Sequence, residues 1–342
     1  MKKQANHLLF VVIIAMLALV KPSAGFTQTA KSQLPKEITF GTAREGTVYF
    51  TMTVGMANIM TKYTPMKVNV QPIGFIRQWG PSMEKGDVHL ALQGLMGSFA
   101  YHYGALYWKD LPAHTWLQQL TSGHGGNYGF FVRADSKIHT IPDLVGKKFY
   151  CLLPAVPLLW YAADGIFEYY GIRHEDVKEL KVTSWAEAVQ EVVDGRADCV
   201  ITTLGAAFPK IQRAGGCRVL PITKEAGDYL HKKYPSFGRT IVPAGYMGLP
   251  EDTALITDPV VLLTHRDVPE EVTYTVLKAL YDHHDEFVPV HVEAKKWTLD
   301  NAVKAQLIPY HSGAIKYLKE KGLWTKELEQ FQQDALAKNL KK

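Results

Sequence analysis

Short apolar runs that alternate with amphipathic stretches constrain the fold of this 342-residue chain more than any other feature. The first unit is a strand over 37–40, a glycine-containing turn and a helix over 49–62. Strands that alternate with helices indicate parallel sheets covered by helices, so the predicted fold class is α/β. The same pattern predicts strands over 67–71, 88–92, 146–152, 197–201 and 260–263, and helices over 76–85, 158–170, 187–194, 269–287, 292–297 and 312–321.

Ligand-binding residues are expected at the carboxyl ends of these strands, where open α/β sheets bind their ligands. The strand over 197–201 carries Thr202 and Thr203 to such an end. Gly171 follows the helix over 158–170 and is expected in the left-handed conformation that caps a helix. No internal repeat appears in the sequence, which excludes solenoids and arrays.

The N-terminus has the features of an export signal. A basic start precedes an apolar run over 8–20, and Lys21, Pro22 and the small residues Ser23, Ala24 and Gly25 follow. A membrane-spanning helix needs roughly 20 apolar residues, so this run is short for a span. We expect cleavage after Ala24, Gly25 or Ala30 and a mature protein in the periplasm. An uncleaved signal anchor is the alternative.

Charge and cysteine content exclude two further classes of protein. The net charge of +5 falls to near +2 when Lys2, Lys3 and Lys21 leave with the signal, whereas nucleic-acid binding needs a concentrated basic face. Three cysteines are too few for a disulfide-stapled scaffold. Cys199 and Cys217 either pair in an oxidising compartment or remain buried thiols on two strands.

No catalytic motif in the sequence is complete. The loop over 41–46 lacks the Gly-Lys-Ser/Thr of a phosphate loop and predicts at most a site for one small anion. His124 begins a His-Gly-Gly segment like that of an esterase oxyanion hole, but no Gly-x-Ser-x-Gly elbow accompanies it. His283 and His284 would point about 100° apart on a helix and so do not form a metal site. We therefore predict a binding protein and not an enzyme, with no cofactor and no metal.

Seven short motifs, taken in order, resemble the TAXI-type solute-binding receptors of tripartite ATP-independent periplasmic (TRAP) transporters. The resemblance covers nearly all of the mature chain and depends on the order and spacing of the motifs. The motifs are ITFGT at 38–42 with Tyr49, GDVHLA at 86–91 with Gln93, FVRADS at 131–136, IPDLVGKK at 141–148, VDGRAD at 193–198, PAGY at 243–246, and HSGA at 311–314 with Tyr317 and Gly322.

This resemblance implies a two-lobe periplasmic binding protein fold of type II, with the ligand in the cleft between the lobes. Each lobe would be a mixed, mostly parallel sheet flanked by helices. The first lobe would combine residues 31–128 with residues 246–342, and residues 129–245 would form the second lobe. Ligand binding would favour closed lobes, because only the closed form contacts the ligand from both sides.

The chain departs from the family pattern in the three loops that are expected to touch the solute. The first loop carries Arg44 and Glu45, the second carries Phe75, and the third precedes Trp160. We expect a small organic anion whose carboxylate pairs with Arg44 or Arg77. The rest of this ligand would be apolar or aromatic and would pack on Phe75 and Trp160.

Other residues complete the expected ligand site. Tyr49 and Tyr246 match the family pattern, and a phenol can donate a hydrogen bond while its ring packs on a ligand. Secondary candidates are the polar residues Thr47, Gln93, Asn127 and Thr203.

Structural alternatives exist for four of these side chains. Arg44 would form a surface ion pair with Glu45, Arg77 would face solvent, and Phe75 and Trp160 would belong to the cores.

The predicted function is that of an extracytoplasmic receptor that delivers its solute to a TRAP membrane permease. A sensor that is read by another membrane protein is the first alternative, because its cleft residues would not differ. An exported enzyme, which would convert the molecule that it binds, is the second.

Overall fold

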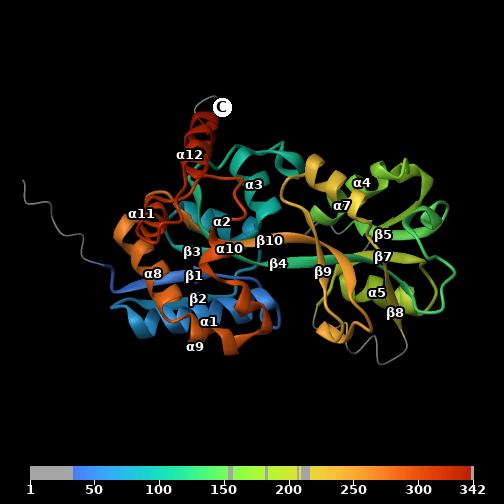
Figure 1. Cartoon of the computed structure of the whole chain (residues 1–342), viewed down its shortest axis with the longest axis horizontal. Helices are drawn as coiled ribbons and strands as arrows, with labels where there is room; N and C mark the ends of the chain where they lie inside the picture. The colour runs from blue at the N-terminus through green and yellow to red at the C-terminus, as the bar shows by residue number, and fades with distance from the viewer. Residues whose placement is uncertain (1–33, 153–156, 182–183, 206–207, 209–215, 340–342) are drawn as a thin grey trace, which may run out of the picture. The chain divides into compact units, whose positions relative to one another are not determined.

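The computed structural model describes residues 34–152, 157–181, 184–205, 208 and 216–339 (Figure 1). The predicted export signal and its cleavage positions lie outside the described residues. Within the described ranges, no helix combines the length and the apolar character that a membrane crossing requires.

Three parallel strands, each followed directly by a helix, form the first part of the sheet. The strand β1 lies between β2 and β3. The three helices therefore begin at the same edge of the sheet, where their N-termini present backbone N–H groups. The elements are β1 (Glu37–Gly41), α1 (Val48–Tyr63), β2 (Lys67–Gln71), α2 (Ile76–Glu84), β3 (Leu90–Gly94) and α3 (Leu95–Tyr103).

A second group of parallel strands comes from the middle of the sequence. Here β5 lies between β6 and β7. Gly171 has a φ of 69°, which confirms the predicted left-handed cap. The elements are β5 (Lys148–Leu152), α4 (Leu158–Tyr169), β6 (Lys178–Lys181), α5 (Trp185–Val193) and β7 (Cys199–Thr203).

Two long antiparallel strands, β4 (Leu117–Arg133) and β10 (Thr253–His265), connect the two groups and lie side by side in Figure 1. One end of β10 pairs with β3 and the other with β9 (Gly238–Val242), whereas β4 also pairs with β7 and β8 (Cys217–Leu220). The ten described strands thus form one mixed sheet whose central pairs are antiparallel. The strand β4 was not predicted, because its glycines and polar residues interrupt the apolar pattern of a strand.

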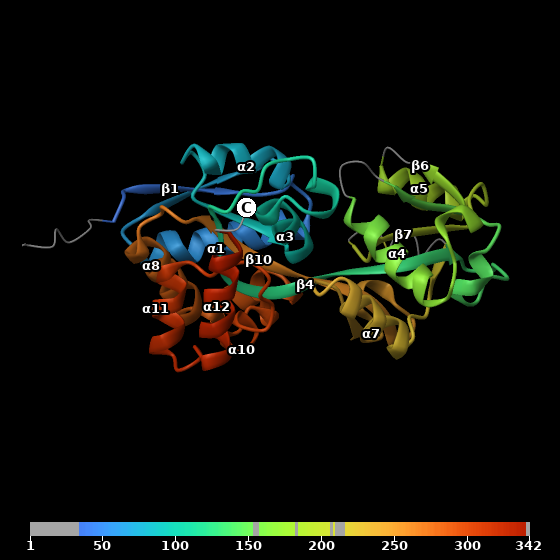
Figure 2. The ribbon, with the colours of Figure 1, turned by 90° about the horizontal axis from the view of Figure 1, so that it is seen from above.

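The last third of the chain returns to the first group of strands. Figures 1 and 2 show α8 and α11 next to each other on this group. The other helices among the described residues are α7 (Lys224–Lys233), α8 (Glu270–Asp282), α9 (His284–Phe287), α10 (Leu299–Ala302), α11 (Ser312–Glu320) and α12 (Lys326–Asn339). Short 3-10 turns are η1 (Leu106–Trp108), η2 (Ile141–Leu144), η3 (His174–Asp176), η4 (Tyr246–Gly248), η5 (Val288–Val290) and η6 (Val292–Lys296).

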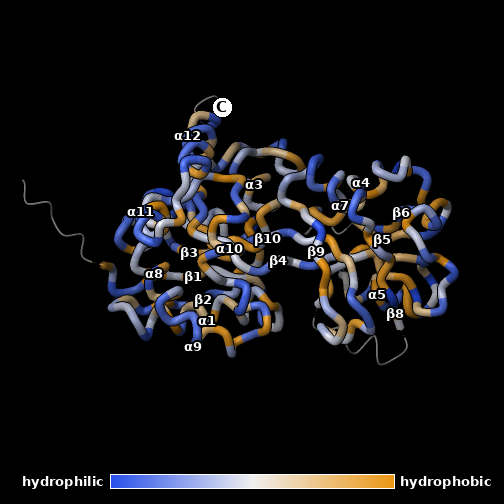
Figure 3. Tube along the Cα trace, viewed as in Figure 1, coloured by the Kyte–Doolittle hydropathy of each residue, from blue (hydrophilic) through white to orange (hydrophobic). Residues whose placement is uncertain are grey.

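Buried apolar side chains gather in separate clusters. Phe40 and Trp297 belong to one cluster around the first group of strands, and Trp79 belongs to another. Phe149 and Phe131 belong to two clusters around the second group. Figure 3 shows hydrophobic stretches in both groups. This separation supports a division into two lobes, whose boundaries stay a prediction.

Candidate ligand-binding site

A buried carboxyl group, Asp258, lies in β10 between the part that pairs with β9 and the part that pairs with β3. Its side chain is 0% exposed. The backbone N–H of Met96, in the first turn of α3, donates a hydrogen bond of 3.1 Å to Asp258 Oδ1. Asp258 Oδ2 is buried and has no hydrogen-bond partner among the described residues. Since an unpartnered buried polar atom costs free energy, this oxygen is a place for a proton or a ligand group.

Three phenols surround this carboxyl group, and we call Asp258, Tyr49, Tyr107 and Tyr128 the Asp258 cluster. Burial raises the pKa of all three phenols, and the nearby Asp258 raises each pKa further. Their hydroxyls therefore stay protonated at neutral pH and can donate hydrogen bonds.

Gly94, at the carboxyl end of β3, leaves the space that the cluster occupies. A Cβ atom at this position would lie 2.3 Å from Asp258 Oδ2 and 3.6 Å from the Tyr49 hydroxyl. The carboxyl oxygen and the phenol thus approach the same point of the backbone. A glycine in a strand often marks such a close approach.

The protonation of Asp258 decides what the cluster can bind. Burial raises the pKa of Asp258 from 3.8 to about 8, and the hydrogen bond from Met96 opposes this shift. At neutral pH the carboxyl group is therefore mostly protonated and can donate through its O–H. Together with the phenols it forms a set of donors that suits a carboxylate or a similar oxyanion.

His124 lies beside the cluster, with its ring centroid 6.2 Å from that of Tyr49. Trp297 Nε1 donates a hydrogen bond of 2.9 Å to His124 Nδ1. Burial lowers the pKa of His124 to about 4, so its ring is neutral. Because Nδ1 accepts a hydrogen bond, the ring proton lies on Nε2, which is then a further donor.

The structure brings three of the predicted site residues to one place. Tyr49 belongs to the Asp258 cluster, and its ring meets that of Phe75 edge-on at a centroid distance of 6.1 Å. Phe75 directly precedes α2 and is 36% exposed. The backbone N–H of Ile76 donates to Gln93 Oε1 at 3.3 Å, which places Gln93 beside Phe75.

Asn127 and Thr203 lie next to the cluster on neighbouring strands. Thr203 pairs with Tyr128, and Asn127 pairs with Thr257, the residue before Asp258. Asn127 is buried and Thr203 is exposed. Thr203 therefore lies on the same face of the sheet as Tyr128, whereas Asn127, opposite Thr257, faces away from Asp258.

Thr47 and Arg44 lie in the loop before α1. The Thr47 hydroxyl accepts from Phe50 N at 3.2 Å and donates to Arg44 O at 2.8 Å, so it caps the helix. Arg44 is exposed, and in the part of the chain that the structure describes it makes no ion pair with Glu45. The alternative of a surface ion pair is thus not adopted.

Two predicted contact residues have packing partners of their own. The Arg77 guanidinium lies 5.7 Å from the ring centroid of Trp108. Trp160 stacks on His174, with 4.4 Å between the ring centroids. These contacts account for both side chains without a ligand, and for Trp160 they agree with its alternative role in a core.

Tyr246 lies in the turn η4 and reaches a different partner. Its hydroxyl donates a hydrogen bond of 2.5 Å to Oε1 of the buried Glu293. This bond links the segment after β9 to the segment before α10.

Sequence reasoning missed Asp258, Tyr107 and Tyr128. The available signal for Asp258 was a single acidic residue within the apolar run of β10. The two tyrosines carry no comparable signal, because they come from distant parts of the chain. Tyr107 lies in the turn η1, and Tyr128 lies in β4.

A pocket of about 320 Å³ lies near the same strand, lined by Thr257, Pro259 and the segments 235–238 and 304–307, among others. None of the ten predicted site residues lines it. Because side chains alternate along a strand, Thr257 and Pro259 face away from Asp258. This pocket is therefore distinct from the Asp258 cluster.

The cysteines follow one of the two alternatives that the sequence left open. Cys199 is a free, buried thiol, and Cys217 is buried on β8. A disulfide between these two residues is not formed in the structure.

Comparison with known proteins places the chain in a family and supports its fold. A family model described as the NMT1-like family matches residues 40–322. MatC from Rhodopseudomonas palustris, solved with bound malate, is similar with a TM-score of 0.51 at 12% identity, over 76% of this chain and 90% of that chain.

Two further solved structures have a TM-score of 0.50. One is a putative sulfonate ABC transporter's periplasmic sulfonate-binding protein, SsuA, from Methylobacillus flagellatus KT, at 14% identity over 84% of this chain and 88% of that chain. The other is a TctC solute binding protein from Polaromonas, at 12% identity over 77% of this chain and 88% of that chain. At these identities the likeness concerns the fold, and it confirms the predicted two-lobe α/β fold of periplasmic binding proteins.

Proposed function

This chain belongs to the NMT1-like family, and from its fold and the Asp258 cluster we propose that it is an extracytoplasmic receptor for a small organic anion. The observation that carries the proposal is the buried, unpartnered Oδ2 of Asp258. An oxyanion of the ligand would accept hydrogen bonds from protonated Asp258 and from the phenols of the cluster. Charged acceptors strengthen such bonds, which favours an anion over a neutral group.

The remainder of the ligand would be apolar or aromatic. Phe75 offers an exposed ring next to Tyr49, and burying one such ring can contribute on the order of 2 kcal/mol. Arg44 stays a candidate for a second contact to the anion, because it is exposed at the start of α1. Gln93 and Thr203 complete the proposed site.

The solved structures support this class of ligand. MatC was solved with malate, and SsuA is named for sulfonate, so both names refer to organic anions. The fold that they share with this chain is suited to capture and release of a solute without chemistry.

Variants of Asp258 test the proposal. Isothermal titration calorimetry of the mature protein with aromatic and branched carboxylates should give micromolar dissociation constants. Asp258→Ala and Tyr49→Phe should weaken binding roughly tenfold or more, because each removes a donor to the anion. Asp258→Asn should retain most of the affinity, because its amide also donates.

The exposed Asp228 provides a matched control, since it pairs with Lys224 on the surface of α7. Asp228→Asn should leave binding unchanged, and circular dichroism should show that each variant is folded. If Asp258→Asn abolishes binding as fully as Asp258→Ala, the ligand group at this position is a cation and the proposed class is wrong. Millimolar or weaker binding of every carboxylate would have the same consequence.

We further propose that the receptor delivers its ligand to a TRAP-type permease, which the seven TAXI-like motifs support. Neighbouring genes for membrane subunits with four and twelve helices would favour transport, whereas a neighbouring histidine kinase gene would favour sensing. Native mass spectrometry of freshly purified protein, followed by extraction, would identify a bound compound. Recovery of a chemically altered compound would instead indicate an enzyme.

A further inference from the structure

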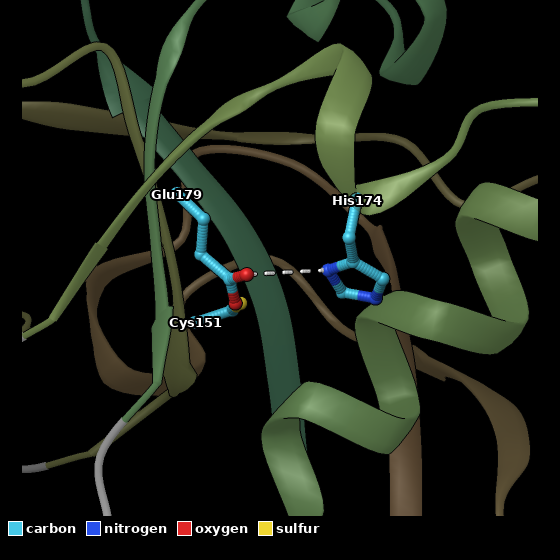
Figure 4. Close-up of side chains that lie close together, drawn as sticks. All are labelled: Cys151, His174 and Glu179. Carbon is cyan, nitrogen blue, oxygen red and sulfur yellow. Dashed lines mark hydrogen bonds and ion pairs between the residues drawn. The ribbon is translucent and has the colours of Figure 1, made fainter.

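A cysteine, a histidine and a glutamate converge in the second group of strands (Figure 4). Cys151 lies on β5, His174 begins the turn η3, and Glu179 lies on β6. One donor atom of each residue lies within 4.8 Å of the other two. Glu179 Oε1 is 2.5 Å from Cys151 Sγ, and Glu179 Oε2 is 3.7 Å from His174 Nδ1.

The imidazole of His174 lacks the hydrogen-bond partners that its two buried nitrogens require. Both ring nitrogens are buried atoms, and neither has a hydrogen-bond partner among the described residues. A neutral imidazole carries one N–H and one lone pair. A lone pair that is buried without a partner costs free energy, and a metal ion would remove this cost.

The surroundings hold the imidazole in the manner of a metal ligand. Trp160 stacks on the ring with an interplanar angle of 12°. His174 Nε2 faces Asp164 Oδ1 at 3.7 Å. Asp164 Oδ2 in turn accepts hydrogen bonds from Lys233 at 2.7 Å and Tyr234 at 2.8 Å. A carboxylate behind the second ring nitrogen is the usual outer partner of a metal-binding histidine.

We propose that Cys151, His174 and Glu179 bind a zinc ion, with water as the fourth ligand. Thiolate, imidazole and carboxylate are the ligand types that zinc uses in proteins. Zinc bonds of about 2.0–2.3 Å bring such atoms to roughly 3.5 Å from one another, so only small side-chain shifts are needed. The thiol proton leaves to solvent on binding, and the thiolate and carboxylate then neutralise the two charges of the ion.

A nucleophilic cysteine fits these residues less well than a metal site. Cys151 is fully buried, and its hydrogen bond goes to Glu179 and not to an imidazole. A catalytic cysteine also needs access for its substrate, and the burial of Cys151 denies this access.

Zinc would cross-link β5, the turn η3 and β6, which the pairing of β5 with β6 and the stack of Trp160 on His174 also hold together. The consequence is a more stable second group of strands, since a ligand that binds only the folded state raises stability by mass action. The site would also fix Trp160 through its stack on His174.

Metal binding to the full mature protein tests the proposal. After dialysis against a chelator, the protein should take up one equivalent of zinc, measured by inductively coupled plasma mass spectrometry, and unfold at a higher temperature. Cobalt in place of zinc should give a thiolate-to-cobalt charge-transfer band. Cys151→Ser should abolish this band, and His174→Gln and Glu179→Gln should weaken zinc binding at least tenfold.

The exposed Glu175, in the same turn as His174, provides a matched control because it pairs only with Arg173 in the described part of the chain. Glu175→Gln should keep one equivalent of zinc with unchanged affinity. Substoichiometric zinc in the folded wild-type protein would overturn the proposal, and so would a cobalt complex without the thiolate band. The two wild-type measurements stand even if a variant fails to fold.

Discussion

The contribution of Asp258 to the stability of the ligand-free protein should fall as the pH rises from about 5 to about 7, and Asp258→Asn should remove this contribution. Asp258 is 0% exposed, and burial raises its pKa from 3.8 to about 8. Between these two values the folded chain holds a proton that the unfolded chain has released. The stabilising contribution of this proton is complete below the pKa of Asp258 in the unfolded chain and is lost as the pH rises through the pKa in the folded chain.

The size of the effect follows from this one proton. The free energy of unfolding changes by about 1.4 kcal/mol per pH unit for each proton that only the folded state binds. Two pH units within the window give a fall of up to about 3 kcal/mol. Asn at position 258 keeps an oxygen that can accept from Met96 N but does not titrate, so it is a matched reference.

Urea unfolding, followed by intrinsic fluorescence at about pH 5 and about pH 7, gives the required free energies. Each protein gives a change in the free energy of unfolding between the two pH values. Subtracting the change measured for Asp258→Asn from that of the wild type cancels the titration of all other groups. Asp228→Asn, at an exposed acid, should behave like the wild type. The free energy of unfolding of the wild type minus that of Asp258→Asn is compared at the two pH values. If this difference changes by less than about 1 kcal/mol, the raised pKa of Asp258 is refuted.

Two further substitutions test the packing around the proposed site. Gly123→Ala should destabilise the protein by roughly 3 kcal/mol or more, because the added Cβ would lie 2.1 Å from the Trp297 ring. The control Gly205→Ala, whose Cβ would lie 3.7 Å from its nearest atom, should change the free energy of unfolding by less than about 0.5 kcal/mol. Equal losses in the two variants would contradict a steric overlap between residue 123 and Trp297. Tyr246→Phe should cost about 1–3 kcal/mol, because it removes the hydrogen bond to the buried Glu293. Thermal or urea unfolding measures both, and an unchanged Tyr246→Phe midpoint would show that water replaces the lost hydroxyl.

Much of the local structure could be predicted from the sequence. The strand predicted over 67–71 is β2, and the helix predicted over 158–170 is α4 to within one residue. Periodicity and turn residues act over a few positions, so they are readable without the fold. The strand β4 was missed because its pairing with β10 and β7, and not an apolar pattern, holds it extended.

The candidate site was predicted only in part. Tyr49 and Phe75 meet, as expected for residues at neighbouring strand ends. Arg77 instead lies over Trp108, because a guanidinium on an exposed helix face takes the nearest aromatic ring. Which of these residues touches the ligand stays a prediction until binding is measured.

By itself, the sequence determined the α/β class, most positions of the helices and strands, and the left-handed cap at Gly171. These properties depend on neighbours along the chain. Only the tertiary structure decided that Asp258 is a buried acid among phenols and that Cys151, His174 and Glu179 share one place. The reason is physical: burial and the pairing of distant strands set both the pKa of a side chain and the atoms within its reach.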